Sequence, residues 1–312
     1  MEKFIAEHKA RFVETDFAWM AEWGFDFVRL PMDYRCWARQ DEWSRIDEEE
    51  LKQIDEAVRF GETYGVHVSL SFHRAPGYSV NPNPPEPVSL WRNEEAQEAF
   101  AEHWRTFAKR YQGIPNERVS FNLVNEPSQV PEDVYVRVAL RAIEAIRDAD
   151  PDRLIISDGL QWGRQPIHGL SSHGIAQSTR GYDPMPLTHY KAGWVEGAMN
   201  WPEPEWPLTA NSTTWDKERL RVTRIAPWLE VAAKGVGVHV GECGAFNSTP
   251  HHVTLAWLRD NLELWKEAGW GWALWNFRGA FGVLDSQRSD VHYDDFRGHA
   301  LDRQMLDLLR AN

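Results

Sequence analysis

The sequence has little cysteine, fewer basic than acidic residues and no long apolar run. Two cysteines, Cys36 and Cys243, are too few for a disulfide framework, so they leave the redox compartment open. The 34 Lys and Arg residues against 47 Asp and Glu residues give a net charge of −13, which repels phosphate backbones and anionic lipids. Nucleic acids and membrane surfaces are therefore not expected as partners.

Apolar stretches stay well short of the ~18 to 20 residues needed to cross a bilayer. The first twelve residues, MEKFIAEHKARF, contain no apolar signal core. As it stands the chain is expected to be soluble and cytoplasmic, or secreted if a leader has been removed. No internal repeat, low-complexity tract or linker argues for a second domain.

Tryptophan is unusually abundant in this sequence. The chain holds 17 Trp residues, more than core packing requires, because the indole is large and its N–H needs a partner. Flat apolar faces of this kind are surfaces on which sugar rings stack.

Short β-branched or aromatic runs alternate with amphipathic stretches of helical period from about residue 25 onward, which is typical of strand–helix units around a parallel sheet. The predicted strands cover residues 25–30, 67–72, 119–125, 154–157, 185–189, 236–241 and 271–276. The predicted helices cover residues 14–23, 47–64, 94–111, 132–149, 217–234, 252–268 and 301–310. The pattern indicates an α/β fold, a (β/α)8 barrel forming a single domain over residues 1–312.

An eight-stranded barrel requires one more strand, before the helix at 14–23. The segment KFIAEHKARF is short of β-branched residues, so the first strand is expected to be missing or non-ideal. Exposed strand edges attract other strands. Residues 1–10 are therefore expected to cover the gap, or a second copy of the chain to do so, as a homo-oligomer through the exposed barrel edge.

Two predicted strands end in a glutamate. Leu123-Val124-Asn125-Glu126-Pro127 places a carboxylate and a proline after a buried run, and Glu242 follows a second run between two glycines. A carboxylate there costs free energy unless it is used or paired. The alternative is a strand-terminal Glu that caps the next helix, but cleavage of a glycosidic bond requires two carboxyls, which favours a catalytic pair.

The other strand ends complete a pattern. In order along the chain, polar or aromatic residues close the runs VRLP, SFHR, LVNEP, LTHY, VGE and ALWN: Arg29, His73, Asn125-Glu126, His189-Tyr190, Glu242 and Trp275. This ordered set resembles glycoside hydrolase family five, the cellulase family of the retaining clan with (β/α)8 barrels, along nearly the whole chain. The departure is at the front, where the family's first strand is absent.

The resemblance implies a role for each residue. Glu126 would be the general acid/base and Glu242 the nucleophile, with their carboxyls ~5 to 5.5 Å apart as retention requires. Tyr190 and Arg29 would favour the ionised form of Glu242. Asn125 would bind the sugar 2-OH, and Trp275 would form the floor under the reacting sugar.

The remaining candidates concern substrate binding. His73 and His189 would bind sugar hydroxyls or orient the glutamates, although a structural histidine is the alternative for each. Six tryptophans on strand-end loops would stack sugars: Trp37, Trp162, Trp194, Trp201, Trp206 and Trp215. No cofactor or metal is expected, because the pair His251-His252 and the spacing His168 to His173 are more typical of a solvated surface.

The predicted function is hydrolysis of β-1,4-linked glucan by a retaining endoglucanase of the cellulase type, acting on a polysaccharide or oligosaccharide. A β-mannanase or an exo-acting β-glycosidase is the alternative within the same chemistry. A carbohydrate-binding pseudoenzyme is a different class, but both glutamates are present. A phosphate-handling barrel would need a Gly-rich loop after its last strands, where GECGAFNST and FRGAFGVLDS carry aromatics and an acid instead.

Overall fold

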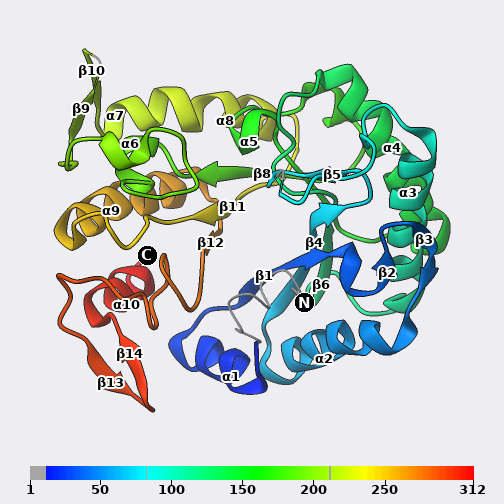
Figure 1. The fold of residues 1–312 in the computed structure, drawn as a ribbon, viewed down its shortest axis with the longest axis horizontal. Helices are drawn as coiled ribbons and strands as arrows, with labels where there is room; N and C mark the ends of the chain where they lie inside the picture. Colours follow the sequence, from blue (N-terminus) through cyan, green and yellow to red (C-terminus); the bar gives the residue numbers. More distant parts are fainter. Residues whose placement is uncertain (1–11, 82, 211) are drawn as a thin grey trace. The chain divides into compact units, whose positions relative to one another are not determined.

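The computed structural model describes residues 12–81, 83–210 and 212–312 (Figure 1). Contacts within the chain divide it into two compact units. The first unit extends to Ser178 and includes Gly235–Gly237, and the second unit comprises Thr179–Lys234 and Val238–Asn312. Each unit is described by itself.

The first unit is built on parallel strands that are neighbours in chain order. These strands are β1 Phe27–Asp33, β4 His67–Ala75, β6 Val119–Asn122, β7 Ile155–Asp158 and the first half of β8 Ala176–Gly181. The helices are α1 Glu14–Trp23, α2 Glu48–Tyr64, α3 Glu94–Arg110, α4 Glu132–Ala149 and α5 Leu160–Gly163, with 3-10 turns η2 Tyr34–Cys36 and η3 His168–Leu170. Small antiparallel pairs are formed by β2 Ala38–Arg39 with β3 Glu42–Ile46 and by β5 Tyr78–Ser79 with the end of β4.

The two faces of β4 differ in chemistry because successive side chains point to opposite sides of a strand. On one face Phe72 packs edge-on against Trp104 of α3, with ring centroids 4.7 Å apart, and both side chains are fully buried. The other face carries Ser69, which lies beside Arg29 of β1 and Ser120 of β6 in the sheet register. This polar face departs from the branched apolar side chains that usually fill a barrel.

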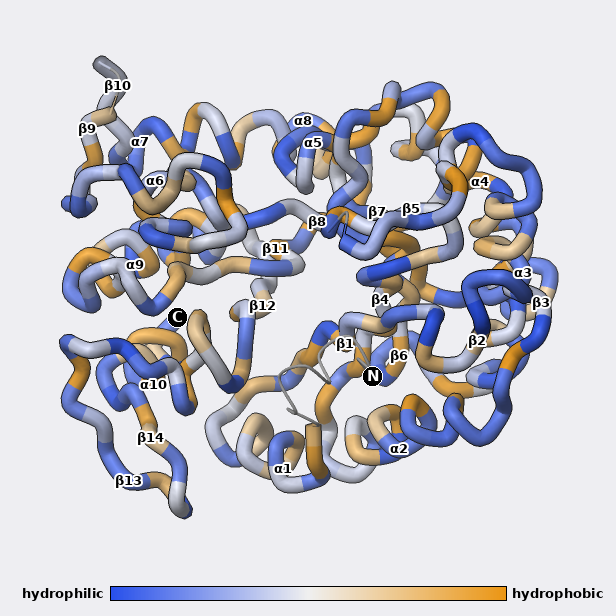
Figure 2. Tube along the Cα trace, in the orientation of Figure 1, coloured by the Kyte–Doolittle hydropathy of each residue, from blue (hydrophilic) through white to orange (hydrophobic). Residues whose placement is uncertain are grey.

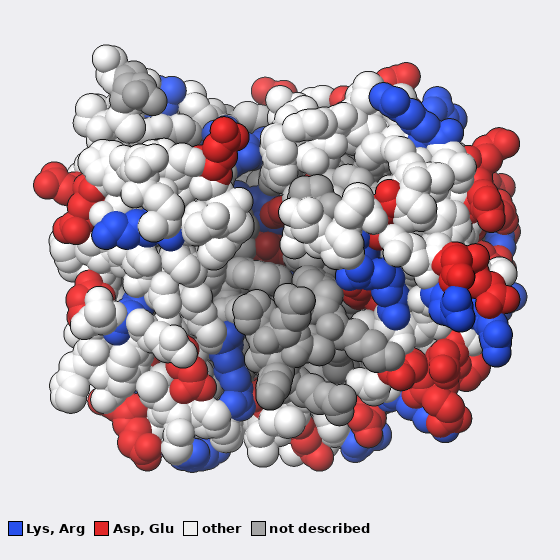
Figure 3. All heavy atoms as spheres, in the orientation of Figure 1, with Lys and Arg blue, Asp and Glu red and all other residues white. Residues whose placement is uncertain are grey.

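Amphipathic helices cover the apolar face of these strands. The alternation of hydrophobic and hydrophilic residues along α2 and α3 can be followed in Figure 2. Their solvent sides carry ion pairs such as Arg110 with Glu48 and Asp55, and Lys52 with Glu49. On the face drawn in Figure 3, Lys and Arg side chains lie next to Asp and Glu side chains around the first unit.

The second unit contains the rest of β8, β11 Val238–Cys243 and β12 Trp272–Leu274, and β11 pairs with β12 in parallel. Its helices are α6 Met185–Thr188, η4 Ala198–Asn200, α7 Lys217–Leu220, the π-helix η5 Arg221–Ile225, α8 Ala226–Ala232, α9 His251–Ala268 and α10 Arg303–Arg310. Two hairpins are formed by β9 Leu208–Ala210 with β10 Thr213–Trp215 and by β13 Asp294–Phe296 with β14 His299–Leu301. None of the helices in the described residues is long and apolar enough to span a membrane.

One predicted strand is wrong. The residues predicted as a strand at 185–189 form the helix α6, Met185–Thr188, which has a proline in its first turn and ends at the cap residue His189. The strand at this place in the chain order is β8. β8 lacks the apolar residues that indicate a strand, because its buried side chains are polar: Gln177 is fully buried and bonds both the N–H and the carbonyl of Ile167. The predicted helices agree with the structure to within one or two residues at most ends. The expectations for the first strand fall on residues 1–10, outside the described residues.

Candidate active site

The segment after β6 holds Glu126 in a strained backbone. Its φ is 48°, in the left-handed region, which costs a non-glycine residue of order 1–3 kcal/mol and is typical of functional sites. Two hydrogen bonds fix this peptide: the Glu126 N–H donates to Asp158 Oδ2 at 2.9 Å, and the Tyr78 hydroxyl donates to the Glu126 carbonyl at 2.7 Å. Burial raises the pKa of the Tyr78 phenol above its usual value, so the hydroxyl stays protonated and donates.

A buried polar cluster surrounds Arg29 of β1. Its Nε donates to Asn122 Oδ1 at 2.8 Å, and its Nη2 donates to Asn125 Oδ1 at 2.9 Å. The same Nη2 lies 3.4 Å from Asp158 Oδ2, and both side chains are almost completely buried. The cluster thus joins Arg29, Asn125 and the residue that anchors Glu126, and it fixes the orientation of the Asn125 amide.

In the second unit, Glu242 lies on β11 with only 5% of its surface exposed. The Tyr182 hydroxyl donates to Glu242 Oε2 at 2.9 Å, and Arg180 Nη2 lies 3.7 Å from Oε1. A hydrogen-bond donor and a guanidinium thus face the two oxygens of the carboxylate. Sequence reasoning gave the tyrosine role to Tyr190, but the tyrosine that the structure places on Glu242 is Tyr182.

Tyr190 has a different environment. It is 5% exposed, and the ammonium of Lys191 lies 4.9 Å from its ring centroid. The neighbouring His189 is half-buried, its Nδ1 lies 2.9 Å from the Thr188 hydroxyl, and its ring lies edge-on to Tyr182 at 5.4 Å. His189 therefore packs beside the hydrogen-bond partner of Glu242.

The loops of the second unit form an aromatic cluster. Trp194 is 63% exposed and packs edge-on against Phe246 at 4.9 Å, while Phe281 contacts both Phe246 and His189 at 5.6 and 5.8 Å. An indole exposed to this extent and held by neighbouring rings is a surface on which a sugar ring can stack. Of the predicted tryptophans in this unit, Trp201 is half-buried, Trp206 donates to Asp260, and Trp215 lies under two arginines.

Trp275 follows β12 directly and is joined to β11 by a hydrogen bond from its N–H to the Cys243 carbonyl at 2.7 Å. Gly244, the residue directly after β11, has φ 149°, and a Cβ there would meet the Trp275 carbonyl at 2.7 Å. Only glycine therefore allows this approach. Burial, together with the Glu242 carboxylate, raises the pKa of the buried Cys243 thiol, which keeps the thiol protonated.

Three predicted residues of the first unit differ in exposure. Trp37 is 2% exposed and packs against Phe72 and His103, so its ring faces are covered by protein, contrary to the expectation that it stacks a sugar. His73 and Trp162 are half-buried, and the backbone N–H of Trp162 donates to the Pro127 carbonyl. In the part of the chain that the structure describes, no group of three or more His, Cys, Asp or Glu side chains could hold a metal ion.

Sequence reasoning missed Asp158, Tyr182, Arg180 and Tyr78. Asp158 ends β7 after the apolar run LIIS, the same pattern of a carboxylate at a strand end that singled out Glu126. Arg180 belongs to β8 and Tyr182 follows it directly, and β8 is the strand that the sequence pattern does not indicate. No sequence signal marks Tyr78, because its contact with Glu126 depends on how the loop after β4 folds back.

Comparisons with known proteins identify the family. A family model described as Cellulase (glycosyl hydrolase family 5) matches residues 10–280. Endoglucanase C of Acetivibrio thermocellus is 27% identical over 92% of this chain and 91% of its own length. Cellodextrinase A of Ruminococcus flavefaciens is 25% identical over 82% of this chain and 75% of its own length.

Solved structures give the fold. A crystal structure described as a glycoside hydrolase is 41% identical, with a TM-score of 0.92, and the match covers 96% of this chain and 92% of that one. Cel5A of Thermotoga maritima, in a structure with mannotriose, is 22% identical with a TM-score of 0.79 over 96% of this chain and 91% of that one. The predicted (β/α)8-barrel fold class is confirmed.

Proposed function

The chain belongs to the cellulase family, glycosyl hydrolase family 5, and from this premise we propose that it hydrolyses β-1,4-linked glucan as a retaining endoglucanase. The membership makes the chain a glycoside hydrolase with a carbohydrate substrate. One observation carries the proposed mechanism: Glu242 is buried, and its two carboxylate oxygens face the Tyr182 hydroxyl and the Arg180 guanidinium, which hold the carboxylate in place as a nucleophile requires.

The reaction proceeds in two displacements. In the first, a Glu242 carboxylate oxygen attacks the anomeric carbon, the glycosidic C–O bond breaks, and the departing oxygen takes the proton of Glu126. A glycosyl ester of Glu242 results. In the second, Glu126 takes a proton from water as the water oxygen attacks the anomeric carbon, and the Glu242 carboxylate is released. Configuration is retained because the carbon is inverted twice.

The strained peptide of Glu126 supports its role as acid/base. A left-handed backbone held by Asp158 on the N–H and by Tyr78 on the carbonyl leaves few orientations for the carboxyl. Proton transfer requires that the carboxyl reach the leaving oxygen within hydrogen-bond distance. We therefore assign Asp158 and Tyr78 as positioning residues.

Substrate binding involves the remaining predicted residues. Asn125, oriented by Arg29, binds the sugar 2-OH, and Trp275 forms the floor under the reacting sugar. His73 and His189 bind sugar hydroxyls, and the exposed indole of Trp194 stacks a ring further along the substrate chain. Trp162 and Trp201, both half-buried, are further stacking candidates, and residues 1–312 act as one catalytic domain.

The roles are tested with an activated aryl cellobioside, such as the dinitrophenyl compound, whose leaving group needs little protonation. Glu126→Ala is expected to retain formation of the glycosyl ester and a burst of phenolate, whereas Glu242→Gln is expected to release none. Glu144→Gln, an exposed glutamate on α4, is the matched control and is expected to behave like the unaltered enzyme. Equal behaviour of the Glu126 and Glu242 variants would refute the assignment.

The substrate is tested by a product profile on glucan, mannan and xylan, with proton NMR of the first product. We expect β-configured cello-oligosaccharides of mixed length from glucan. Faster turnover of mannan than of glucan would make mannan the substrate of this enzyme. Release of single sugars would indicate exo-action, and an α-configured first product would refute retention. Binding of glucan without turnover would make the chain a carbohydrate-binding pseudoenzyme.

A further inference from the structure

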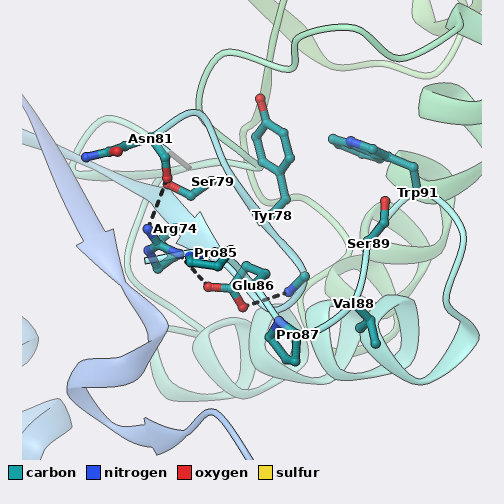
Figure 4. A pocket seen from close by; sticks show the side chains of 11 residues that line it. Arg74, Tyr78, Ser79, Asn81, Pro85, Glu86, Pro87, Val88, Ser89 and Trp91 are labelled. Atoms are coloured by element: carbon teal, nitrogen blue, oxygen red, sulfur yellow. Dashed lines mark hydrogen bonds and ion pairs between the residues drawn. The ribbon is translucent and has the colours of Figure 1, made fainter. Parts of the chain in front are cut away.

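In the first unit, an arginine–carboxylate pair lies in the loop that carries Tyr78. Arg74 Nη1 donates to Glu86 Oε1 at 2.6 Å, and the other oxygen of Glu86 accepts from the Gly77 N–H at 3.2 Å. The pair lies in the wall of a cavity of ≈ 400 Å³ (Figure 4). The residue after Gly77 is Tyr78, whose hydroxyl donates to the Glu126 carbonyl. An ion pair thus fixes the backbone next to a tyrosine that holds a proposed catalytic residue.

A similar arrangement occurs in the second unit, beside the proposed nucleophile. Tyr182 follows β8 directly and donates to Glu242 Oε2 at 2.9 Å. The next residue is Asp183, whose Oδ2 accepts a hydrogen bond from Arg224 Nε at 2.6 Å. The Asp183 and Arg224 side chains are 9% and 26% exposed, so water and salt screen this ion pair only in part. The mechanism described above assigns no role to Arg224.

The local sequence accounts for the position of Arg224. It lies in η5, a π-helical turn, and such turns inside longer helices are frequent at functional sites. Pro227 follows in α8, and it has no N–H to donate to the Thr223 carbonyl four residues before it. Arg224 Nη1 donates to this carbonyl at 3.2 Å. The guanidinium is therefore tied to its own helix as well as to Asp183.

An aromatic ring holds the same guanidinium. Arg224 lies 5.4 Å from the ring centroid of Trp215, and the guanidinium of Arg219 lies 5.3 Å from the same centroid. The Arg219 side chain forms no hydrogen bond or ion pair with any residue that the structure describes. The two arginines therefore share the ring contact and differ in the bond to Asp183, which makes Arg219 the matched control for Arg224.

The backbone that joins Tyr182 to Asp183 is fixed at two further points. The Thr188 hydroxyl donates to the Tyr182 carbonyl at 2.5 Å, and the Trp257 indole N–H donates to the Asp183 carbonyl at 2.9 Å. With both carbonyls bonded, the pair with Arg224 fixes the segment through the Asp183 side chain as well. Hydrogen bonds weaken steeply when donor and acceptor are misaligned, so a small rotation of this segment would weaken the bond from Tyr182 to Glu242.

We propose that Arg224 is a positioning residue for the proposed nucleophile, because its ion pair with Asp183 holds Tyr182 against Glu242. The proposal rests on the proposed function. Arg224 acts through two other residues and does not act on the substrate itself. Its loss is therefore expected to slow the attack of Glu242 on the anomeric carbon and to leave the affinity for a sugar unchanged.

The test measures kcat/KM for dinitrophenyl cellobioside, which reports the steps up to and including the attack of Glu242. Arg224→Gln is expected to lower kcat/KM about tenfold, as a small displacement of a group at the reacting centre implies. The inhibition constant of cellobiose is expected to stay unchanged. Arg224→Lys keeps the charge and one hydrogen bond to Asp183, so it is expected to recover most of the loss. Arg219→Gln is expected to behave like the unaltered enzyme.

A double-mutant cycle separates positioning from a general effect on the fold. Tyr182→Phe removes the bond through which Arg224 acts. Adding Arg224→Gln to Tyr182→Phe is therefore expected to cause little further loss, whereas the losses of two independent sites multiply. Asp183→Asn removes the charge of the other partner and is expected to match Arg224→Gln.

Each outcome decides one point. Losses that multiply in the cycle, an unchanged kcat/KM in Arg224→Gln, or an equal loss in Arg219→Gln would refute the positioning role. Weaker inhibition by cellobiose in Arg224→Gln would also refute it, because Arg224 would then contribute to sugar binding. If the unaltered enzyme cleaves no β-glycoside, the proposed function fails and the positioning role fails with it, whereas cleavage with multiplied losses refutes the positioning role alone. Arg224→Lys and Asp183→Asn keep the result interpretable if Arg224→Gln does not fold.

Discussion

Replacing Asp158 by asparagine tests whether the buried cluster of the first unit positions the acid/base. The carboxylate is completely buried, and its donors include the Glu126 N–H at 2.9 Å, Asn122 Nδ2 at 3.0 Å and Arg29 Nη2 at 3.4 Å. Asparagine has the same shape, but one of its two terminal atoms becomes a donor. At least one of the three donors then faces another donor.

The expected cost follows from this count. A buried donor without an acceptor costs ~1–3 kcal/mol, and removing one partner of a buried ion pair costs ~3–5 kcal/mol. The two costs overlap because Arg29 and Glu126 share Asp158 Oδ2, so we expect a loss of about 3 kcal/mol. An unfolding entropy of ~2.1 cal/mol/K per residue over 312 residues corresponds to about 1.5 °C per kcal/mol, so Tm falls by roughly 4–5 °C.

Activity distinguishes positioning from stability. Asp158→Asn is expected to slow glucan hydrolysis, which requires protonation of the leaving group, more than hydrolysis of a dinitrophenyl cellobioside at the same temperature. Asp150→Asn is the matched control, because it breaks a buried pair with Arg153, at 2.7 Å, that has no contact with Glu126. The control is expected to lower Tm without changing the leaving-group dependence. A Tm shift below about 2 °C, or equal leaving-group dependence in both variants, would refute the reasoning.

Three further predictions concern other parts of the molecule. Tyr182→Phe removes the hydrogen bond to Glu242, worth ~1.5–3 kcal/mol for a charged acceptor, so kcat is expected to fall roughly tenfold to a hundredfold, and an unchanged kcat would exclude this role. Burial lowers the pKa of His103, so between the folded and unfolded pKa values the unfolded chain binds a proton that the folded chain does not. Stability is therefore lost as pH falls below ~6.5. In His103→Gln the slope of Tm against pH from 7 to 5 is expected to be smaller. Gly181→Ala brings a Cβ within 2.6 Å of the Trp265 indole and 2.8 Å of the Cys243 Cβ, so it is expected to lower the free energy of unfolding in denaturant by ~1–3 kcal/mol. Gly193→Ala is the control and is expected to cost much less, because a Cβ there meets nothing within 4 Å.

The sequence predicts the helices better than the strands because the two elements bury different surfaces. Helices such as α2 and α4 pack one apolar stripe and expose the other side, which leaves a clear period of 3.6 residues. The strands β4, β6 and β8 are buried on both faces, and one face is polar. β4 and β6 contain enough apolar residues to indicate strands, but β8, AQSTRG, contains almost none. The MPLTH segment that follows it therefore predicts the strand instead.

The candidate site follows the same division. Glu126 and Glu242 could be found because a carboxylate at the end of an apolar run stands out in the sequence. Asp158 could have been found by the same rule. Tyr182 and Tyr78 could not, because a tyrosine in a loop becomes a partner of a glutamate only through a contact between segments 60 and 48 residues apart.

The left-handed backbone of Glu126 bears on the history of the chain. An L-residue in this conformation costs of order 1–3 kcal/mol, while glycine adopts it freely. Glycine lowers the free energy of unfolding by ~0.5–1 kcal/mol because of its greater freedom in the unfolded state. The relief of backbone strain is as large or larger, so Glu126→Gly would be neutral or stabilising for the fold. Random drift without selection for turnover would therefore tend to erase this glutamate. A lineage that kept only sugar binding would have no reason to retain a strained acid at this position, so its presence favours an enzyme that is still under selection to cleave its substrate.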